Sequence, residues 1–378
     1  MSEGPVSSPT GDETEGQSSN ASSGTRTVDR SLRRRIESAA LVACCFITLL
    51  MMGFLLTDWL RFWSDTAQLI HGQYLVIGEW IDFYLDTIVF GFPSTWRALA
   101  AGLMIGLAAP IIGAFLIHRQ MALIGETLAH TAFAGIGAGV VIVGLTGWTG
   151  QLLLIDLGSQ GGLLLVALLV SALGALGLQW LSSHSQSYGD VPIAIVLAGS
   201  FAIGTLLISW ARDFAPITVD VEGFLFGSLA IVTTEGARLI ALLSLLVSVV
   251  VLTNFKQFVF ITFDEEAAKV ARIQVTKYNT LLVVMTAVVV VGAMQILGVI
   301  LVAAMLVIPA AAASQIALSF RETVILAVLF GQLSALAGLL FSLLASLPPG
   351  GSIVVVAIVI YLIAVLVSNR SPKGLPAY

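Results

Sequence analysis

The sequence predicts an all-α protein, a bundle of about nine or ten helices that cross a lipid bilayer. Of its 378 residues, 58% are hydrophobic and only 10% are charged, whereas a soluble domain carries about 25% charged residues. Apolar runs of spanning length, about 20 residues each, recur along most of the chain. The short alternating segments typical of a transmembrane β-barrel do not occur in the sequence.

The first 30 residues predict a disordered tail, because they are rich in Ser, Gly, Thr and Glu and have almost no apolar content. No positively charged region opens the chain, so we do not interpret this tail as a signal peptide. Three consecutive arginines, Arg33 to Arg35, then precede the first apolar run.

Ten apolar segments follow in order, and each is long enough for a spanning helix. The seventh and eighth segments form one long apolar run, which we divide near Gly298. Pro309 also interrupts this run, so one of its two parts could be a broken or half-crossing helix. The segments are 39–57, 98–117, 121–147, 162–181, 191–210, 237–255, 278–295, 297–316, 323–343 and 352–368.

The distribution of basic residues predicts the orientation of the bundle. If the N-terminus lies in the cytoplasm, thirteen of the seventeen Lys and Arg residues fall on the inside. The other four, Arg61, Arg97, Arg212 and Arg238, fall outside. Because cytoplasmic loops are enriched in Lys and Arg, we expect an even number of crossings of the plasma membrane, with both termini cytoplasmic.

Two connections are long enough to have a role of their own. Residues 58–97 lie outside in this topology and contain four tryptophans and two tyrosines, which favour the headgroup level of a bilayer. We expect part of this segment to lie along the membrane interface. Residues 256–277 lie inside and are the most charged internal segment.

The stretch "ALIGETLAHTAFAGIGAG" carries Glu126 and His130 four residues apart, on the same side of a helix. A carboxylate oxygen and an imidazole nitrogen are ligands for one divalent ion such as zinc or manganese. An ionisable residue at membrane depth costs roughly 2.5–3.5 kcal/mol and by default indicates a functional site. The alternatives are a mutual hydrogen bond that fixes packing, or a position near the helix end where both groups reach water.

Three further features carry weaker signals. Gly135 and Gly139 have a small-xxx-small spacing, which predicts the close approach of another helix. Gln295 precedes the break at Gly298, where unwound backbone could line a cavity, although such a glutamine is more often a link between helices. The segment 263–273, "FDEEAAKVARI", predicts a short helix with acids first and bases last. It is either a docking helix or a solvated amphipathic loop.

Missing motifs exclude some functions. The sequence has no G-x-x-x-x-G-K-[ST], so we expect no ATP binding through a P-loop of its own. It has no H-E-x-x-H, which argues against an intramembrane zinc protease of that type. Nothing in the sequence predicts a nucleic-acid partner or a permanently bound cofactor.

Five stretches, taken together and in order, resemble the metal-type ABC permease family, the membrane subunits of zinc, manganese and iron importers. Each is similar to one signature of that family, and they extend from about residue 97 to 368. They are "FLIHRQMALIGETLAHTAFAGIGAG" (115–139), "VEGFLFGSLAIV" (221–232), "FDEEAAKVARI" (263–273), "QILGVILVAAMLVIPAAAA" (295–313) and "SLPPGGSIVVV" (346–356).

The resemblance implies a type II ABC importer permease, which pairs as a homodimer on two ATPase subunits and receives metal from an extracellular binding protein. Glu126, where the family commonly has aspartate, and His130 would be metal-pathway ligands, with Gln295 as a possible pathway residue. The coupling helix seated in the ATPase would contain Phe263, Asp264, Glu265, Glu266, Ala267 and Ala268.

The resemblance divides the chain into three regions. Residues 1–30 are the tail, residues 31–96 hold an extra helix and the aromatic outer segment, and residues 97–370 are the permease domain. Two departures stand out. The segment after the coupling helix has no glycine, and no acidic residue stands before Pro348.

The sequence therefore predicts the membrane subunit of an ATP-driven importer of divalent transition metal, zinc or manganese and possibly iron. ATP hydrolysis would occur on the partner subunit. One alternative is a permease of the same fold for a metal chelate such as a siderophore or cobalamin. A second is an ion-coupled secondary transporter, whose inverted repeats are not visible. An intramembrane enzyme using His130 as a base would need a nucleophile or a full metal site, and the sequence offers neither.

Overall fold

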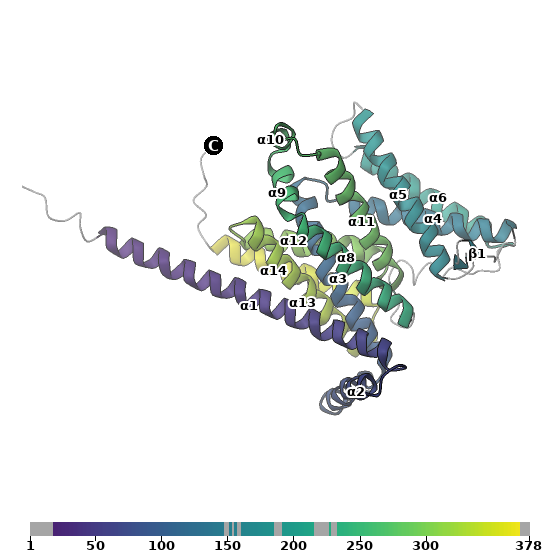
Figure 1. Cartoon of the computed structure of the whole chain (residues 1–378), viewed down its shortest axis with the longest axis horizontal. Coiled ribbons are helices and arrows are strands. Elements are labelled where there is room, and N and C mark those ends of the chain that lie inside the picture. The colour runs from purple at the N-terminus through teal and green to yellow at the C-terminus, as the bar shows by residue number, and fades with distance from the viewer. Residues whose placement is uncertain are drawn as a thin grey trace, which may run out of the picture.

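The computed structural model describes residues 18–146, 151–152, 155–156, 160–184, 191–214, 227 and 233–370. These residues form a helical bundle (Figure 1), with one antiparallel pair of two-residue strands, β1 Gln151–Leu152 and β2 Ile155–Asp156. The helices in the first half are α1 Ser18–Leu60, α2 Asp65–Leu85, α3 Pro93–His118, α4 Ile124–Thr146, α5 Gln160–His184 and α6 Val191–Ala211.

The second half of the chain contributes the rest of the bundle. Its helices are α8 Thr234–Thr253, α9 Phe255–Phe263, α10 Glu265–Val270, α11 Val275–Leu297, α12 Val299–Ile316, α13 Phe320–Ala345 and α14 Pro349–Arg370. Within the described residues, nine helices are long and apolar enough to cross a membrane, and α5 contains a shorter apolar stretch, Leu165–Leu181. The predicted all-α membrane bundle is confirmed, and each of the ten expected segments coincides with a helix.

The structure defines two helix boundaries more closely than the sequence does. The long apolar run divides at Gly298, whose φ of 83° ends α11 and precedes α12. Glycine adopts this positive φ without the Cβ strain of other residues. Pro309 lies inside α12 and does not end it.

At the other end of the chain, α1 begins at Ser18, so residues 18–30 are helical where the sequence predicts a disordered tail. Extending an existing helix needs no new nucleation, so a polar segment can continue it.

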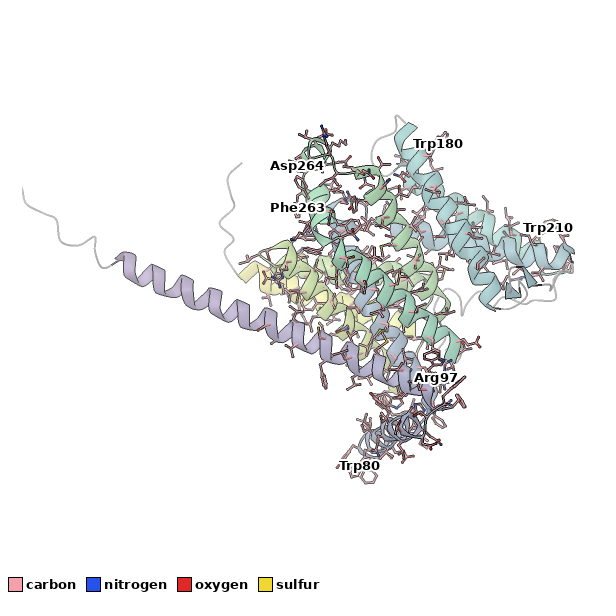
Figure 2. All side chains as sticks on the ribbon, viewed as in Figure 1. Trp80, Arg97, Trp180, Trp210, Phe263 and Asp264 are labelled. Carbon is pink, nitrogen blue, oxygen red and sulfur yellow. The ribbon has the colours of Figure 1, made fainter. Side chains whose placement is uncertain are left out.

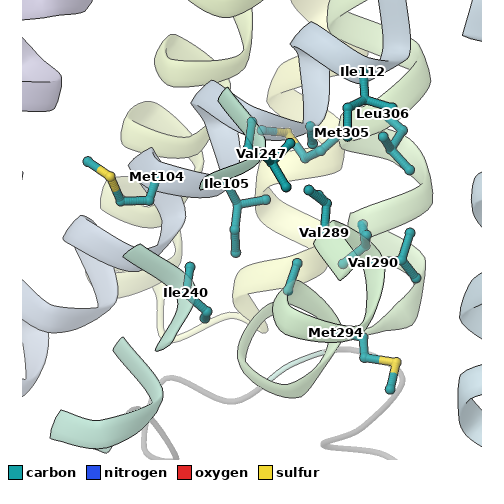
Figure 3. Close-up of a cluster of buried hydrophobic side chains, with 14 of the residues drawn as sticks. Met104, Ile105, Ile112, Ile240, Val247, Val289, Val290, Met294, Met305 and Leu306 are labelled. Carbon is teal, nitrogen blue, oxygen red and sulfur yellow. The ribbon is translucent and has the colours of Figure 1, made fainter. Parts of the chain in front are cut away.

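Helix α3 forms the centre of the core and packs against α8, α12 and α13. Its small residues allow this, since Gly113 lies directly against the main chain of Leu306 on α12. Figure 3 shows apolar side chains around this helix, with Ile105 and Ile112 of α3 near residues of α8, α11 and α12. The methionine side chains Met104, Met294 and Met305 are also almost fully buried.

Helices α4, α5 and α6 form a layer at one side of the bundle (Figure 1). The glycines of α4 set their spacing. A Cβ on Gly135 would lie 2.8 Å from Val170 Cβ, and one on Gly139 would lie 3.0 Å from Leu163 Cδ2, both on α5. On the adjacent side, a Cβ on Gly137 would lie 3.1 Å from the carbonyl oxygen of Gly204 on α6. The close approach predicted from the glycine spacing is confirmed, and α5 is the partner.

The bundle has two different ends (Figures 1 and 2). Helix α10 lies at one end, beside Phe263 and Asp264. Helix α2 lies at the other, near Arg97, and Figure 1 shows it nearly along its axis while α1 runs across the view. Large side chains of α2 are exposed, including Trp80 at 61% and Phe83 at 81%. The outer aromatic segment is therefore a separate helix that crosses the direction of α1, as an interfacial helix would.

Candidate functional site

A cavity of about 320 Å³ lies between α4 and α12. It combines two ionisable side chains from α4 with a wall of small and branched apolar side chains from α12. Its lining residues are Ala122, Leu123, Glu126, His130, Val299, Ile300, Ala303, Ala304 and Val307. The two sequence-predicted metal ligands thus lie in one cavity, and the α12 wall is what sequence reasoning missed. Its four-residue spacing, Val299, Ala303 and Val307, could have indicated that face.

Glu126 occupies the first turn of α4. The chain reaches this helix through a tight turn in which Gln120 has a φ of 57° and the Met121 N–H donates to the Leu116 carbonyl at 2.8 Å. A carboxylate in the first turn is stabilised by the positive end of the helix dipole. The side chain is 44% exposed. Glu126 therefore faces the cavity with a partly exposed carboxylate.

His130 lies one turn further along α4 and is more enclosed, with a side chain that is 16% exposed. Its Nε2 stands 3.9 Å from Glu126 Oε1. Its Nδ1 is buried and has no hydrogen-bond partner among the described residues. The edge-to-face contact with Phe201 of α6, 5.0 Å between ring centroids, holds the imidazole in place. The ring therefore presents Nε2 to the carboxylate side of the cavity.

The separation of these two atoms fits a shared divalent ion. Metal–nitrogen and metal–oxygen bonds of such ions are about 2.0–2.2 Å long, so one ion can contact two atoms that are 3.9 Å apart. At 3.9 Å the pair is beyond hydrogen-bond distance, which disfavours a mutual hydrogen bond as its reason. In the described part of the chain no group of three or more His, Cys, Asp or Glu side chains gathers around an ion site. A tight structural site would need about four ligands.

Gln295, the possible pathway residue, lies near the end of α11. Its side chain is outside what the structure describes, and the lining of the cavity among the described residues does not include it. The stretch 221–232 also falls outside the described residues, apart from Gly227, which has a φ of 78°.

Helix α10 is the short charged helix predicted within 263–273. Asp264 caps it by accepting a hydrogen bond from the Ala267 N–H at 2.8 Å. Ala268 is fully buried against the apolar cluster of Ile261 and Val275, while Phe263 remains 61% exposed. The helix is therefore fixed on one side and open on the other. The Lys269 ammonium donates hydrogen bonds to the carboxylates of Glu266 and Glu265, and these bonds raise its pKa, with the larger effect from Glu266.

An aromatic cluster joins this helix to the core. Phe263 packs edge-on against Phe320 at the start of α13, with ring centroids 5.5 Å apart. The Phe320 ring lies 5.0 Å from His118 and 5.0 Å from Phe115, both on α3. Beside it, the Arg119 guanidinium donates to the Asn279 Oδ1 of α11 at 2.8 Å. Sequence reasoning missed this cluster, because its members come from three separate segments.

The nine candidate spanning helices of the described residues define a multi-pass membrane protein. The model of the ABC 3 transport family matches residues 92–368, and the chain belongs to this family. Helix α1 and helix α2 precede the matched range.

Proteins similar to the chain include two curated relatives and one solved structure. The manganese transport system membrane protein MntC of Listeria monocytogenes is 32% identical over 52% of this chain and 69% of the relative. The MntC protein of Halalkalibacterium halodurans is 28% identical over 77% of this chain and 92% of the relative. The structure of PsaBC from Streptococcus pneumoniae in complex with Fab matches with a TM-score of 0.61 and 27% identity, over 76% of this chain and 95% of the other.

Proposed function

We propose that this chain is the membrane-spanning permease subunit of an ATP-driven importer of divalent transition metal ions. The observation that carries the proposal is the 3.9 Å separation of Glu126 Oε1 and His130 Nε2 in a cavity between two spanning helices. Membership of the ABC 3 transport family supports the transport role. In this proposal the Glu126 carboxylate and the His130 imidazole are ligands of the transported metal ion.

Manganese is the first expectation for that cargo, with zinc and iron next. Two similar proteins are named as manganese transport system membrane proteins. An imidazole with a carboxylate suits all three metals, since neither ligand is as soft as a thiolate. The Glu126 side chain is one methylene longer than that of an aspartate, which places its carboxylate further from the helix backbone. The size of the cavity and the two ligands together then set the metal preference.

In this proposal the pair holds the ion only in transit. Two protein ligands leave the remaining coordination positions to water, so the ion binds weakly enough to leave again. The apolar α12 wall, with Val299 and Ala303, excludes other polar ligands from that side. The cavity thus acts as a brief stop on a route, with Gln295 proposed as a second pathway residue near the break at Gly298.

The partners follow from the same assignment. Helix α10, with Asp264 to Ala268 and the exposed Phe263, is the coupling helix that contacts the ATPase subunit. ATP hydrolysis takes place on that subunit. Two copies of this chain pair as a homodimer on two ATPase subunits, and an extracellular protein delivers the metal. Both termini then lie in the cytoplasm, on the side of α10, and residues 97–370 make up the permease domain.

The test is metal uptake by cells that express the chain with its ATPase and binding protein. Glu126→Gln and His130→Gln each remove one ligand while keeping side-chain size, and we expect each to reduce uptake of manganese by at least about ten-fold, about 1.4 kcal/mol. Glu235→Gln is the matched control, since Glu235 is also a first-turn carboxylate of a spanning helix. Co-purification of the ATPase verifies assembly. Normal uptake by both ligand variants would remove the basis of the site.

A further inference from the structure

A second cavity, outside the proposed metal route, lies in a groove between α1 and α8. Its volume is about 400 Å³. One wall comes from the helix that precedes the family domain and the other from the domain itself. The lining residues are Met52, Leu55, Leu56, Trp59, Arg238, Leu239, Ala241, Leu242 and Leu245.

The groove opens where lipid surrounds the protein. Its α1 residues belong to the spanning segment Ser38–Leu60 and its α8 residues to the spanning segment Thr234–Thr253. Met52, Leu55, Leu56 and Trp59 follow the spacing of one helix face, and Leu242 on the opposite wall is 62% exposed. An apolar chain is therefore the matching occupant along the length of the groove.

The groove ends at the headgroup level. Trp59 is 54% exposed and Trp63, in the turn after α1, is 87% exposed. Tryptophans of this kind mark the interface between the hydrocarbon region and water. Among the described residues that line the groove, Arg238, in the second turn of α8, is the one charged side chain. The groove thus has an apolar body and a cationic end at the depth of lipid phosphates.

The Arg238 guanidinium has donors to spare. Its Nη2 donates to the Asp58 main-chain carbonyl at 3.3 Å, while its Nε is buried and has no hydrogen-bond partner among the described residues. The nearby Asp58 carboxylate is already occupied by Arg97, at 3.1 Å, and Arg61, at 3.5 Å. No carboxylate of the described part of the chain lies within ion-pair distance of Arg238. Among the described residues, Arg238 therefore has no counter-ion.

We propose that this groove binds one acyl chain of an anionic phospholipid, with its phosphate on Arg238. Guanidinium groups bind phosphate through paired N–H donors, so the positive charge of Arg238 suits an anionic headgroup. A second copy of the chain is the weaker occupant. An apolar helix laid over the groove would bury the Arg238 charge without an opposite charge, which is costly in a membrane. A lipid supplies the missing charge and the apolar chain together.

The test is native mass spectrometry of the full chain purified in detergent, with phosphatidylglycerol or phosphatidylcholine of identical acyl chains added. We expect Arg238→Gln to reduce retained phosphatidylglycerol about ten-fold, because a hydrogen bond to a charged group is worth roughly that change in Kd. Arg212→Gln is the control, an exposed arginine at the end of α6, away from the groove. Leu242→Trp fills the groove, and Leu246→Trp is its control on the same helix, at 51% exposed and outside the lining.

Support requires loss of phosphatidylglycerol in both groove variants and retention in both controls. Equal retention in all four variants overturns the site. Equal retention of phosphatidylcholine and phosphatidylglycerol by the unmodified chain overturns the anionic assignment. A dimer that Leu242→Trp abolishes while lipid retention is unchanged assigns the groove to a second copy instead.

Discussion

The Arg97 guanidinium holds the Asp58 carboxylate through two hydrogen bonds, from Nε to Oδ2 at 3.1 Å and from Nη2 to Oδ1 at 3.2 Å. Asp58 is 1% exposed and belongs to α1, whereas Arg97 is in the first turns of α3. This pair therefore joins the helix that precedes the family domain to the central helix of the bundle.

Removing that carboxylate should loosen α1. Asp58→Ala leaves Arg97 and Arg61 without their counter-ion in a buried position, and breaking such a pair costs about 3–5 kcal/mol. We expect a lower unfolding temperature in detergent and faster proteolysis at the turn 61–64. Asp65→Ala, which removes an exposed carboxylate of α2, should change neither. Equal behaviour of the two variants would show that the pair does not hold the helix.

Glu126→Asp tests the reach of the proposed ligand. The shorter side chain withdraws the carboxylate by about one carbon–carbon bond, about 1.5 Å, from a position already 3.9 Å from His130 Nε2. We expect the metal concentration for half-maximal uptake to rise several-fold while the ATPase still co-purifies. An unchanged concentration dependence would mean that the carboxylate and the imidazole need not contact the same ion.

Gly135→Ala tests the packing of α4 on α5. The added Cβ would lie 2.8 Å from Val170 Cβ and 2.9 Å from Ala167 Cα, and overpacking of this kind costs about 1–3 kcal/mol. We expect a lower unfolding temperature in detergent. Gly199→Ala on α6, where a Cβ meets nothing within 4 Å, is the matched control and should leave the temperature unchanged or raise it. The packing interpretation is wrong if both variants behave alike.

The Asp82 carboxylate should make the loop after α2 sensitive to acid. Burial raises the pKa of its carboxyl, but hydrogen bonds from the N–H groups of Phe90, Val89 and Gly91 and from the Thr87 hydroxyl outweigh this, and the pKa is lowered from 3.8 to about 2. Because the folded pKa is the lower one, the stabilisation is complete above about pH 4 and is lost as the pH falls through about 2.

The measurement is hydrogen exchange of the amides in residues 87–92. At pH 5, Asp82→Asn should raise their exchange to the level that the unmodified chain shows near pH 2, after correction for the intrinsic pH dependence of exchange. Asp86→Asn is the control, since Asp86 has a φ of 53° and asparagine tolerates that conformation. Protection that is independent of residue 82 contradicts this account.

Phe320→Ala tests the aromatic cluster beneath α10. Loss of the ring removes its contacts with Phe263, His118 and Phe115. The packing of the proposed coupling helix against α3 is then weaker, although Phe263 keeps its direct contact with His118, at 6.0 Å between ring centroids. We expect ATP hydrolysis by the assembled transporter to continue while metal uptake per ATP falls. Phe341→Ala, on the same helix but 48% exposed, is the control and should leave the ratio unchanged. A normal ratio in Phe320→Ala would separate the cluster from coupling.

Local patterns made the elements predictable. Apolar runs give spanning helices because each must satisfy its backbone hydrogen bonds internally in lipid, and Gly298 divides the longest run because its φ is positive. The Gly135 and Gly139 spacing predicted a close neighbour but not that α5 fills it. Helix α2 was expected only as an interfacial segment, because its apolar residues are mixed with charged ones.

The composition of the site was harder to predict. Glu126 and His130 are neighbours on one helix, so their proximity follows from the spacing alone. The α12 wall of Val299 and Ala303 comes from a segment more than 160 residues away, and no local pattern indicates such a pairing. The same holds for Phe320 against Phe263, because contacts between distant segments depend on how the helices pack.

Helix α2 has a consequence for the height at which the protein sits in the bilayer. Its exposed Trp80 and Phe83, on a helix that crosses the direction of α1, fix one end of the bundle at one surface (Figure 2). A thicker or thinner hydrocarbon layer must then be accommodated at the opposite end, where α10 lies, by tilt or local deformation of lipid. Labelling of single cysteines at both ends, in vesicles of graded acyl-chain length, should show depth changes near Phe263 and none near Trp80.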